Sequence, residues 1–234
     1  MLESLQAYRA RTAFMWDSLP RDGRLCTGAG LARKVNPDGS FRPFCGDTVI
    51  FTLPQDMVDW LAGVQAALYD AWGECLAERI APDTFHITLH DLLSQPETMP
   101  EGTNDNRPLA QAAIRQACAE RPSPIGVRSC SLFSMVGTSL VMGFEPSAEA
   151  DCAALMGMYE RFQRIVPLGY PLTLHVTLAY YKPGEYSQDM LHRLRTALAS
   201  IGRERREWRL DMRALHYAAF TSMAQYRLFP AADP

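Results

Sequence analysis

The hydrophobic positions of this chain follow strand-like and helix-like spacings in an order that occurs twice. Residues 48–54 form an apolar run that ends in proline, hydrophobic side chains then recur at helical spacing, and a second strand pattern follows at 84–89. Residues 139–146 are again an apolar run that ends in proline, followed by a helical pattern and a strand pattern at 173–178. The chain therefore contains an internal repeat of two strand-helix-strand units.

The segments after each unit correspond as well. The first unit is followed by a helix opened by Pro108 and by a strand at about 125–133. The second unit is followed by a helix between Ser187, which suits an N-cap, and Gly202, and then by an extended stretch up to residues 220–223. We predict an α+β fold built as a bilobal internal duplication, with two mainly antiparallel sheets, helices on their outer faces and a central cleft.

The first part of the chain lies outside this repeat. We predict that residues 1–47 are an N-terminal elaboration and that residues 48–234 form the bilobal domain. Residues 2–16 have the hydrophobic spacing of an amphipathic helix. The next stretch is rich in glycine, proline and aspartate, and Asn-Pro-Asp-Gly at 36–39 predicts a turn between two short extended pieces.

The second strand of each unit carries the same motif, His-x-Thr-Leu, at residues 86–89 and 175–178. Side chains alternate between the two faces of a strand, so His86 and Thr88 share one face, about 6.6 Å apart along the strand. His175 and Thr177 do the same in the second motif. The other motif residues are apolar and are expected to point toward the helices. If a pseudo-two-fold axis relates the lobes, two imidazoles and two hydroxyls meet across the cleft.

The repetition of the motif matters, because a single histidine on a strand is most often structural. Composition alone predicts roughly 0.06 occurrences of H-x-[ST]-L in a chain of this length, and two copies in on the order of one chain in 500. Duplication of an inert strand is the structural alternative.

Two imidazoles and two hydroxyls around one small volume suit the cleavage of a phosphoester without a metal ion. A neutral imidazole takes a proton from water or a ribose hydroxyl, and an imidazolium protonates the leaving oxygen. Both forms are available because the ordinary histidine pKa is about 6.5. We predict that His86 and His175 are catalytic. Thr88 and Thr177 are predicted to bind substrate by donating hydrogen bonds to the phosphate oxygens.

The paired motifs, the strand and helix before each and the bilobal repeat resemble the 2H phosphoesterase superfamily over about residues 48–230. That superfamily includes the bacterial 2′-5′ RNA ligase-like proteins and the 2′,3′-cyclic nucleotide phosphodiesterases. The resemblance implies acid–base catalysis by the two motif histidines, phosphate binding by the two motif threonines, and a site that works without a metal. Residues 42–50 look like the entry to the first strand in an uncharacterised branch of the superfamily, and residues 1–41 have no counterpart in its minimal fold.

Three aromatic residues are further candidates for the cleft. Tyr181 follows the second motif in phase with its histidine. We predict that it binds substrate by stacking on a base or by a hydrogen bond to phosphate, with packing at the strand end as the alternative. Phe133 and Tyr226 fall at matched places in the two halves, and for both of them core packing is the alternative to lining the cleft.

His90 allows a second interpretation of the first histidine strand. It is in phase with His86, so it either pairs with Asp91 at the strand end or joins His86 and His175 as a metal ligand. No in-phase carboxylate completes such a set, and the resemblance implies a metal-independent site. We therefore predict no metal and no cofactor.

Composition and charge narrow the class of partner. The chain has 234 residues, of which 47% are hydrophobic and 21% charged, and a formal net charge of −3, which argues against a broad nucleic-acid coat. It has no apolar run of membrane-spanning length, no signal-peptide pattern at the N-terminus and no C-x-x-C pair among six cysteines. We expect a cytoplasmic monomer with reduced cysteines and no membrane contact.

Three functions are compatible with these features. The first is a metal-independent phosphodiesterase, a hydrolase that opens a 2′,3′-cyclic phosphate or cleaves a related ribose-linked phosphodiester in a nucleotide or an RNA end. The second is a reversible 2′-5′ RNA ligase or an exonuclease acting on RNA ends. The third is a non-catalytic protein that binds RNA or a nucleotide in the same cleft. We predict the first, and turnover of 2′,3′-cyclic AMP separates it from a binding protein.

Overall fold

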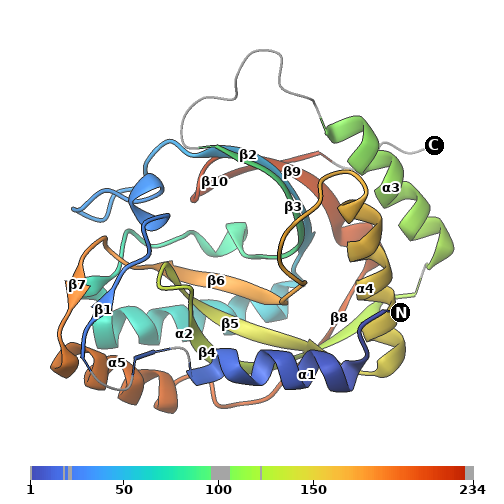
Figure 1. The fold of residues 1–234 in the computed structure, drawn as a ribbon. Coiled ribbons are helices and arrows are strands. Elements are labelled where there is room, and N and C mark those ends of the chain that lie inside the picture. The colour runs from blue at the N-terminus through green and yellow to red at the C-terminus, as the bar shows by residue number, and fades with distance from the viewer. Residues whose placement is uncertain (1, 18, 21–22, 96–105, 122, 230–234) are drawn as a thin grey trace.

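The computed structural model describes residues 2–17, 19–20, 23–95, 106–121 and 123–229. Its centre consists of two four-stranded antiparallel sheets, whose histidine strands β3 and β6 approach each other (Figure 1). The first sheet has the order β10 (Gln225–Phe229), β9 (Leu215–Ser222), β2 (Cys45–Thr52), β3 (His86–Gln95). The second sheet has the order β6 (His175–Tyr180), β5 (Ser139–Pro146), β4 (Ile125–Met135), β8 (Glu207–Leu210).

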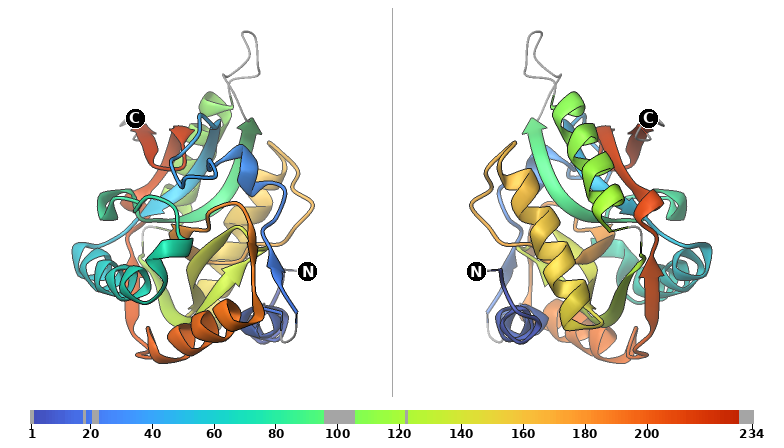
Figure 2. Two further views of the ribbon diagram at one scale, coloured as in Figure 1. Left: turned by 90° about the vertical axis from the view of Figure 1, so that its left-hand side faces the viewer. Right: turned by 90° about the vertical axis from the view of Figure 1, so that its right-hand side faces the viewer.

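Helices pack against both sheets, and one of them contacts strands of both (Figures 1 and 2). In the first sheet, β9 is contacted by α3 (Arg107–Glu120) and β3 by α4 (Glu149–Gln163). In the second sheet, β6 is contacted by α2 (Gln55–Trp72) and β4 by α5 (Gln188–Ser200). The helices form where apolar side chains recur at helical spacing; those of α2 that are buried include Met57, Leu61, Val64, Leu68 and Trp72. The predicted α+β bilobal architecture is therefore confirmed.

Each sheet takes one inner strand from the other half of the repeat. Strand β9 follows the second histidine motif in the sequence, yet it lies beside β2 in the first sheet. Strand β4 follows the first motif and lies beside β5 in the second sheet. From the histidine strand outward, the first three strands of each sheet, β3-β2-β9 and β6-β5-β4, correspond in the repeat, whereas the edge strands β10 and β8 do not. The two lobes are real, but neither is a contiguous half of the chain.

The N-terminal helix is shorter than the predicted 2–16. Helix α1 (Leu5–Ala13) begins after Ser4, whose side chain accepts a hydrogen bond from the Ala7 amide, and it passes into a 3₁₀ turn at Phe14–Asp17. The hydroxyl of Tyr8 donates to the carbonyl of Phe144 and accepts from the amide of Leu174, both at 2.9 Å. Helix α1 is therefore fixed against the second sheet.

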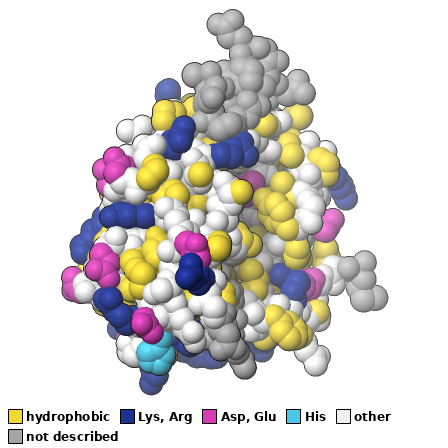
Figure 3. Space-filling model, turned by 60° about the vertical axis from the view of Figure 1, so that its left-hand side comes forward, with side chains coloured by type: hydrophobic (Ala, Val, Ile, Leu, Met, Phe, Trp, Pro, Cys, Tyr) yellow, Lys and Arg dark blue, Asp and Glu magenta, His cyan; other side chains and the backbone are white. Residues whose placement is uncertain are grey.

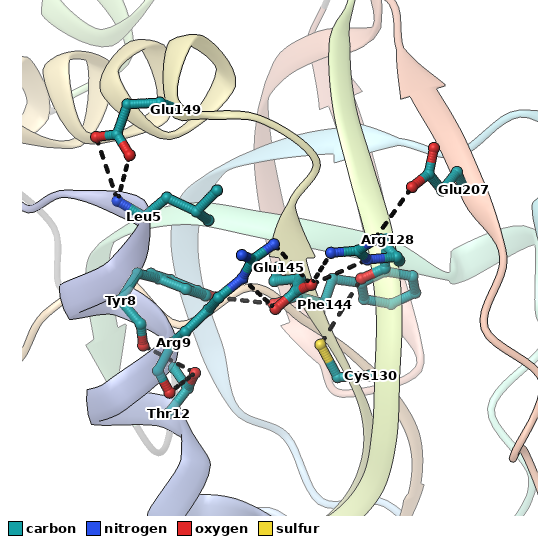
Figure 4. A network of polar contacts seen from close by, with 10 residues as sticks. All are labelled: Leu5, Tyr8, Arg9, Thr12, Arg128, Cys130, Phe144, Glu145, Glu149 and Glu207. Atoms are coloured by element: carbon teal, nitrogen blue, oxygen red, sulfur yellow. Dashed lines mark hydrogen bonds and ion pairs between the residues drawn. The ribbon is translucent and has the colours of Figure 1, made fainter.

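A polar network also holds this helix (Figure 4). The Glu149 carboxylate of α4 accepts from the Leu5 amide at 3.1 Å. Arg9 forms an ion pair with Glu145 of β5, and Glu145 also pairs with Arg128 of β4. These contacts tie residues of the predicted N-terminal elaboration to α4 and β5 of the bilobal domain, and Glu145 extends the network to β4. The boundary at residue 47 remains a prediction; strand β2 itself begins at Cys45.

The predicted turn at residues 36–39 is present. The Gly39 amide donates to the Asn36 carbonyl at 2.9 Å, and Val35 and Phe41 form an antiparallel bridge on either side of the turn. Gly39 has φ +97°, a left-handed conformation that glycine adopts without strain. Its carbonyl accepts from the Glu78 amide at 2.9 Å, which attaches the turn to the body of the protein.

Two further features bear on the sequence-based expectations. No helix in the described part of the chain is long and apolar enough to cross a membrane. All six cysteines are free thiols. Residues 25–26, which include one of these cysteines, form the short strand β1 (Leu25–Cys26) and pair with β7 (Glu185–Tyr186).

Candidate active site

A cavity of about 670 Å³ lies between the two histidine strands, and all four motif side chains line it. His86 and Thr88 enter from β3, and His175 and Thr177 enter from β6. The alternation predicted for the two motifs places imidazole and hydroxyl on the same face of each strand, while Ile87 and the other apolar motif positions are buried. The structure thus brings together the four residues that the motifs selected.

Both histidines are oriented by the same local hydrogen bond. The Nδ1 atom of His86 lies 2.7 Å from the Thr84 carbonyl oxygen, and that of His175 lies 2.8 Å from the Thr173 carbonyl oxygen. A carbonyl only accepts, so Nδ1 carries the proton in each neutral ring. Nε2 is then the nitrogen with the lone pair, available to accept a proton from a reacting group.

Burial sets the charge state of both rings. Desolvation lowers the pKa of His86 below its usual value near 6.5, and the proximity of His175 lowers it further. Desolvation also lowers the pKa of His175, and Lys34 adds to that effect, while Asp91 opposes it for both histidines. Both rings are therefore neutral in the free protein near pH 7. A bound anionic group would favour the imidazolium that the acid role needs.

In both histidine strands, the alternation of side chains is interrupted at the fourth residue of the motif. Strand β3 carries one extra residue at Leu89, because Ile50 pairs with Thr88 while the neighbouring Val49 pairs with His90. Strand β6 does the same at Leu178, because Val141 pairs with Thr177 while Leu140 pairs with Ala179. The fourth residue of each motif is thus the extra residue of a β-bulge.

The bulges decide which later residues reach the cavity. Asp91 and Tyr180, each five residues beyond a motif histidine, line it. The predicted phase would instead have selected Tyr181, which lies outside the cavity, and His90, which borders it. The Asp91 carboxylate accepts from the Tyr170 hydroxyl at 2.8 Å, and the Tyr180 hydroxyl donates to Met223 Sδ at 3.1 Å and interacts with Thr177.

The prediction for Tyr181 does not hold, and the bulge is the reason. Its side chain is fully buried and lies outside the cavity. The ring packs edge-on against Trp72 at a centroid distance of 5.7 Å and against Tyr186 at 6.1 Å. Tyr181 is therefore a core residue, and Tyr180 takes the place in the cavity that was expected for it.

His90 borders the cavity but is held by the core. Its ring is 1% exposed and packs against Tyr159 and Phe162 of α4, with centroid distances of 5.0 and 6.0 Å. It does not form a surface pair with Asp91. Within the residues that the structure describes, no group of three histidine, cysteine, aspartate or glutamate side chains is arranged to hold a metal ion.

Aromatic side chains form one wall of the cavity. The Tyr226 ring packs on His86 at a centroid distance of 4.7 Å and on Phe220 at 5.5 Å, and Phe220 stacks on Phe44 at 6.1 Å. Tyr226 therefore reaches the cavity, whereas Phe133, its counterpart in the repeat, is buried outside it. The matched positions of these two residues indicated a candidate pair, but not which member faces the cavity.

Helix α1 forms hydrogen bonds with the residues directly before the second motif. Arg11 donates to the Leu172 carbonyl at 2.7 Å and to Thr173 Oγ1 at 3.2 Å, and Tyr8 binds the Leu174 amide. The Thr173 carbonyl is the acceptor that orients His175. The segment before residue 48 thus positions a predicted catalytic residue, a role that the sequence patterns did not indicate.

Comparisons with known proteins agree with the fold. No protein-family model and no curated protein matches the chain. The fold is similar to that of a conserved protein of unknown function, ATU0111 from Agrobacterium tumefaciens, with a TM-score of 0.61, 16% identity, and coverage of 88% of this chain and 94% of that one. TT0787 of Thermus thermophilus gives 0.49 at 15% identity, covering 79% and 94%. LigT of E. coli gives 0.45 at 12% identity, covering 80% and 95%.

The similarity to ATU0111 defines the class of fold, a bilobal α+β architecture that the chain shares with that solved structure over most of its length. The similarity to ATU0111 is one of fold, and the resemblance to the 2H phosphoesterase superfamily rests on the paired motifs of the sequence.

Proposed function

We propose that this protein is a metal-independent phosphodiesterase that opens a 2′,3′-cyclic phosphate or cleaves a related ribose-linked phosphodiester. The observation that carries the proposal is the pair of imidazoles, each oriented through Nδ1 by a backbone carbonyl, which face one cavity together with two threonines. The 2H resemblance of the paired motifs supports the same reaction class. A hydrolase of this type needs an acid, a base and hydrogen-bond donors to phosphate, and these four residues fulfil those needs.

The two imidazole rings have different roles in the reaction, one as base and one as acid. The Nε2 atom of one neutral histidine takes a proton from water, and the water oxygen forms a bond to phosphorus. The other histidine, as imidazolium, gives its proton to the ribose oxygen as the bond between that oxygen and phosphorus breaks. Thr88 and Thr177 donate hydrogen bonds to the non-bridging oxygens. The base takes up one proton and the acid gives up one, so the protons balance over the step. In the reverse reaction the two histidines exchange roles.

The size and the lining of the cavity support a nucleotide as substrate. A volume of about 670 Å³ is within the range of small-molecule sites. The wall formed by Tyr226, Phe220 and Phe44 offers ring faces on which a base stacks. On the face shown in Figure 3, basic side chains are interspersed with acidic and apolar ones, which favours a short substrate over a long RNA backbone.

Turnover of 2′,3′-cyclic AMP by the purified protein tests the proposal. We expect His86→Ala and His175→Ala each to lower the rate by at least about 10²-fold with the fold intact. The matched control is His192→Ala, because His192 is exposed on α5 and outside the cavity. Near wild-type turnover by either cavity variant contradicts the paired-histidine mechanism.

Further assays on the same purified protein distinguish the alternative functions. Joining of RNA ends through a 2′-5′ bond, or stepwise shortening of RNA ends, in place of cyclic-phosphate opening would assign the ligase or exonuclease activity. Binding of nucleotides without turnover of cyclic mononucleotides, cyclic dinucleotides or 2′-5′ oligomers would assign a binding protein.

A further inference from the structure

The predicted N-terminal elaboration places a lysine in the cavity. Lys34 lines the cavity, and it is one of only two lysines in the chain. Its Nζ atom lies 5.0 Å from the ring centroid of Phe44 and 5.9 Å from that of Tyr180. Tyr180 belongs to the histidine strand β6, so Lys34 approaches the site from the side of the second motif.

Two backbone hydrogen bonds hold Lys34 in place. Its amide donates to the Leu31 carbonyl at 2.8 Å, and its carbonyl accepts from the Arg42 amide at 2.9 Å. The bridge between Val35 and Phe41 follows immediately in the chain. The ammonium group is therefore presented by a fixed hairpin, as in a preorganised binding site.

The charge of Lys34 is not matched by a neighbour. Within the described ranges, Nζ takes part in none of the side-chain hydrogen bonds or ion pairs; its close contacts are the two rings. Burial lowers the pKa of Lys34, and Asp91 opposes this electrostatically without an ion pair. Placing a desolvated cation without a counter-ion is costly, and ring faces offset only part of that cost.

The other charged groups of the cavity have partners. Arg11 forms a two-pronged ion pair with Glu3 at 2.8 Å. Asp91 accepts from Tyr170 at 2.8 Å and lies 3.4 Å from Thr48 Oγ1. Among the described side chains that line the cavity, Lys34 therefore carries the positive charge that is free to bind an anionic ligand.

We propose that Lys34 is a substrate-binding residue whose ammonium group binds an anionic oxygen of the phosphate held at the two motif histidines. The inference rests on the proposed function for the location of that phosphate. A compact ammonium group with three donors suits a phosphate oxygen, and the charge-assisted bond forms in a site partly shielded from water. The segment 1–47 then completes the substrate site and is more than an attachment to it.

Titration with inorganic phosphate tests the proposal without requiring turnover. We expect Lys34→Met, which keeps the length of the side chain and removes its charge, to raise the Kd for phosphate about 10-fold or more, and Lys34→Arg to restore most of the affinity. The control is Arg33→Met, which removes the adjacent cation over the same Phe44 ring from an exposed side chain outside the cavity. It should change the Kd less than about 2-fold if the effect is local.

A second readout reports the position of the charge. Lys34 lowers the pKa of His175, so Lys34→Met should raise the pKa measured for the His175 ring by NMR, and Arg33→Met should not. A folded Lys34→Met protein, verified by its thermal melting, that binds phosphate as tightly as the wild type would overturn the inference. So would a wild-type protein that does not bind phosphate. Absence of cyclic-phosphate turnover alone would refute the proposed function and leave the phosphate titration to decide on Lys34.

Discussion

Gln65 of α2 donates a hydrogen bond through Nε2 to the carbonyl of Leu178, at 2.9 Å, where β6 carries its extra residue. The same amide nitrogen donates to the Ile80 carbonyl at 2.9 Å, and the Gln65 side chain is buried. A bulge leaves backbone groups without ladder partners, and a buried carbonyl without a partner is costly. Gln65 therefore stabilises the bulge that turns Tyr180 toward the cavity.

Removing this amide should affect both stability and the site. We expect Gln65→Leu to lower the free energy of unfolding by about 1–3 kcal/mol, because two buried carbonyls lose a donor. Amide exchange at residues 178–180 should become faster, because the bulge is less well held. Urea unfolding and hydrogen exchange measure the two effects, with Gln116→Leu on α3 as the exposed control. Unchanged stability would show that the bulge does not depend on Gln65.

The threonine hydroxyls should matter more for catalysis than for folding. Valine keeps the β-branched shape, so Thr88→Val and Thr177→Val should leave the strands in place. Each should lower kcat/KM by up to about 10²–10³-fold through loss of a donor to phosphate. Steady-state kinetics and melting temperature separate the effects, with Thr52→Val of β2, outside the cavity, as the control. Unchanged kinetics with a large drop in melting temperature would make these hydroxyls structural.

The pH dependence of kcat/KM should be a bell centred on the acidic side of 6.5. The reaction needs one neutral ring and one protonated ring, and burial lowers the pKa of both His86 and His175 in the free protein. Activity should fall at low pH as the base becomes protonated, and at high pH as the acid loses its proton. The two limbs report the coupled pair and not the separate histidines. A plateau that extends upward from pH 7 would contradict the acid role.

Chelation distinguishes acid–base catalysis from the alternative metal site. We expect activity to survive EDTA on protein verified to be free of metal. His90→Phe should also retain activity, because phenylalanine preserves the ring packing against Tyr159 and Phe162. Loss of activity on chelation, with recovery in zinc or manganese and sensitivity to the His90 variant, would establish the metal site in its place.

The sequence predicted the repeat, the fold class and the four motif side chains, because each depends on a local period. Strand alternation holds from His86 to Thr88 and from His175 to Thr177, and the structure follows it over those residues. The same rule failed for Tyr181 because one extra residue in β6 inverts the phase, and His90, which follows the extra residue of β3, borders the cavity with its ring held in the core. A bulge depends on its partners, here including a glutamine 113 residues away, and no local pattern marks it.

Lys34 could not be assigned for a related reason. Its place in the cavity depends on Phe44 and on Tyr180, which is distant in the sequence, and on a hairpin attached to Glu78. The turn at 36–39 was predictable from its residues, whereas the direction in which the turn presents the preceding lysine was not. The exchange of β4 and β9 between the sheets is equally non-local, because a strand pattern does not specify its neighbour.

That exchange makes the folding of the first sheet depend on a distant part of the chain. Among the described strands of its sheet, the first histidine strand pairs with β2, and the other neighbour of β2 is β9, which follows both motifs in the sequence. A nascent chain ending before residue 215 has the two motifs but lacks half of its first sheet. The first histidine strand therefore gains the full support of its sheet only from segments that follow both motifs, whereas the sheet of the second histidine strand is complete by Leu210.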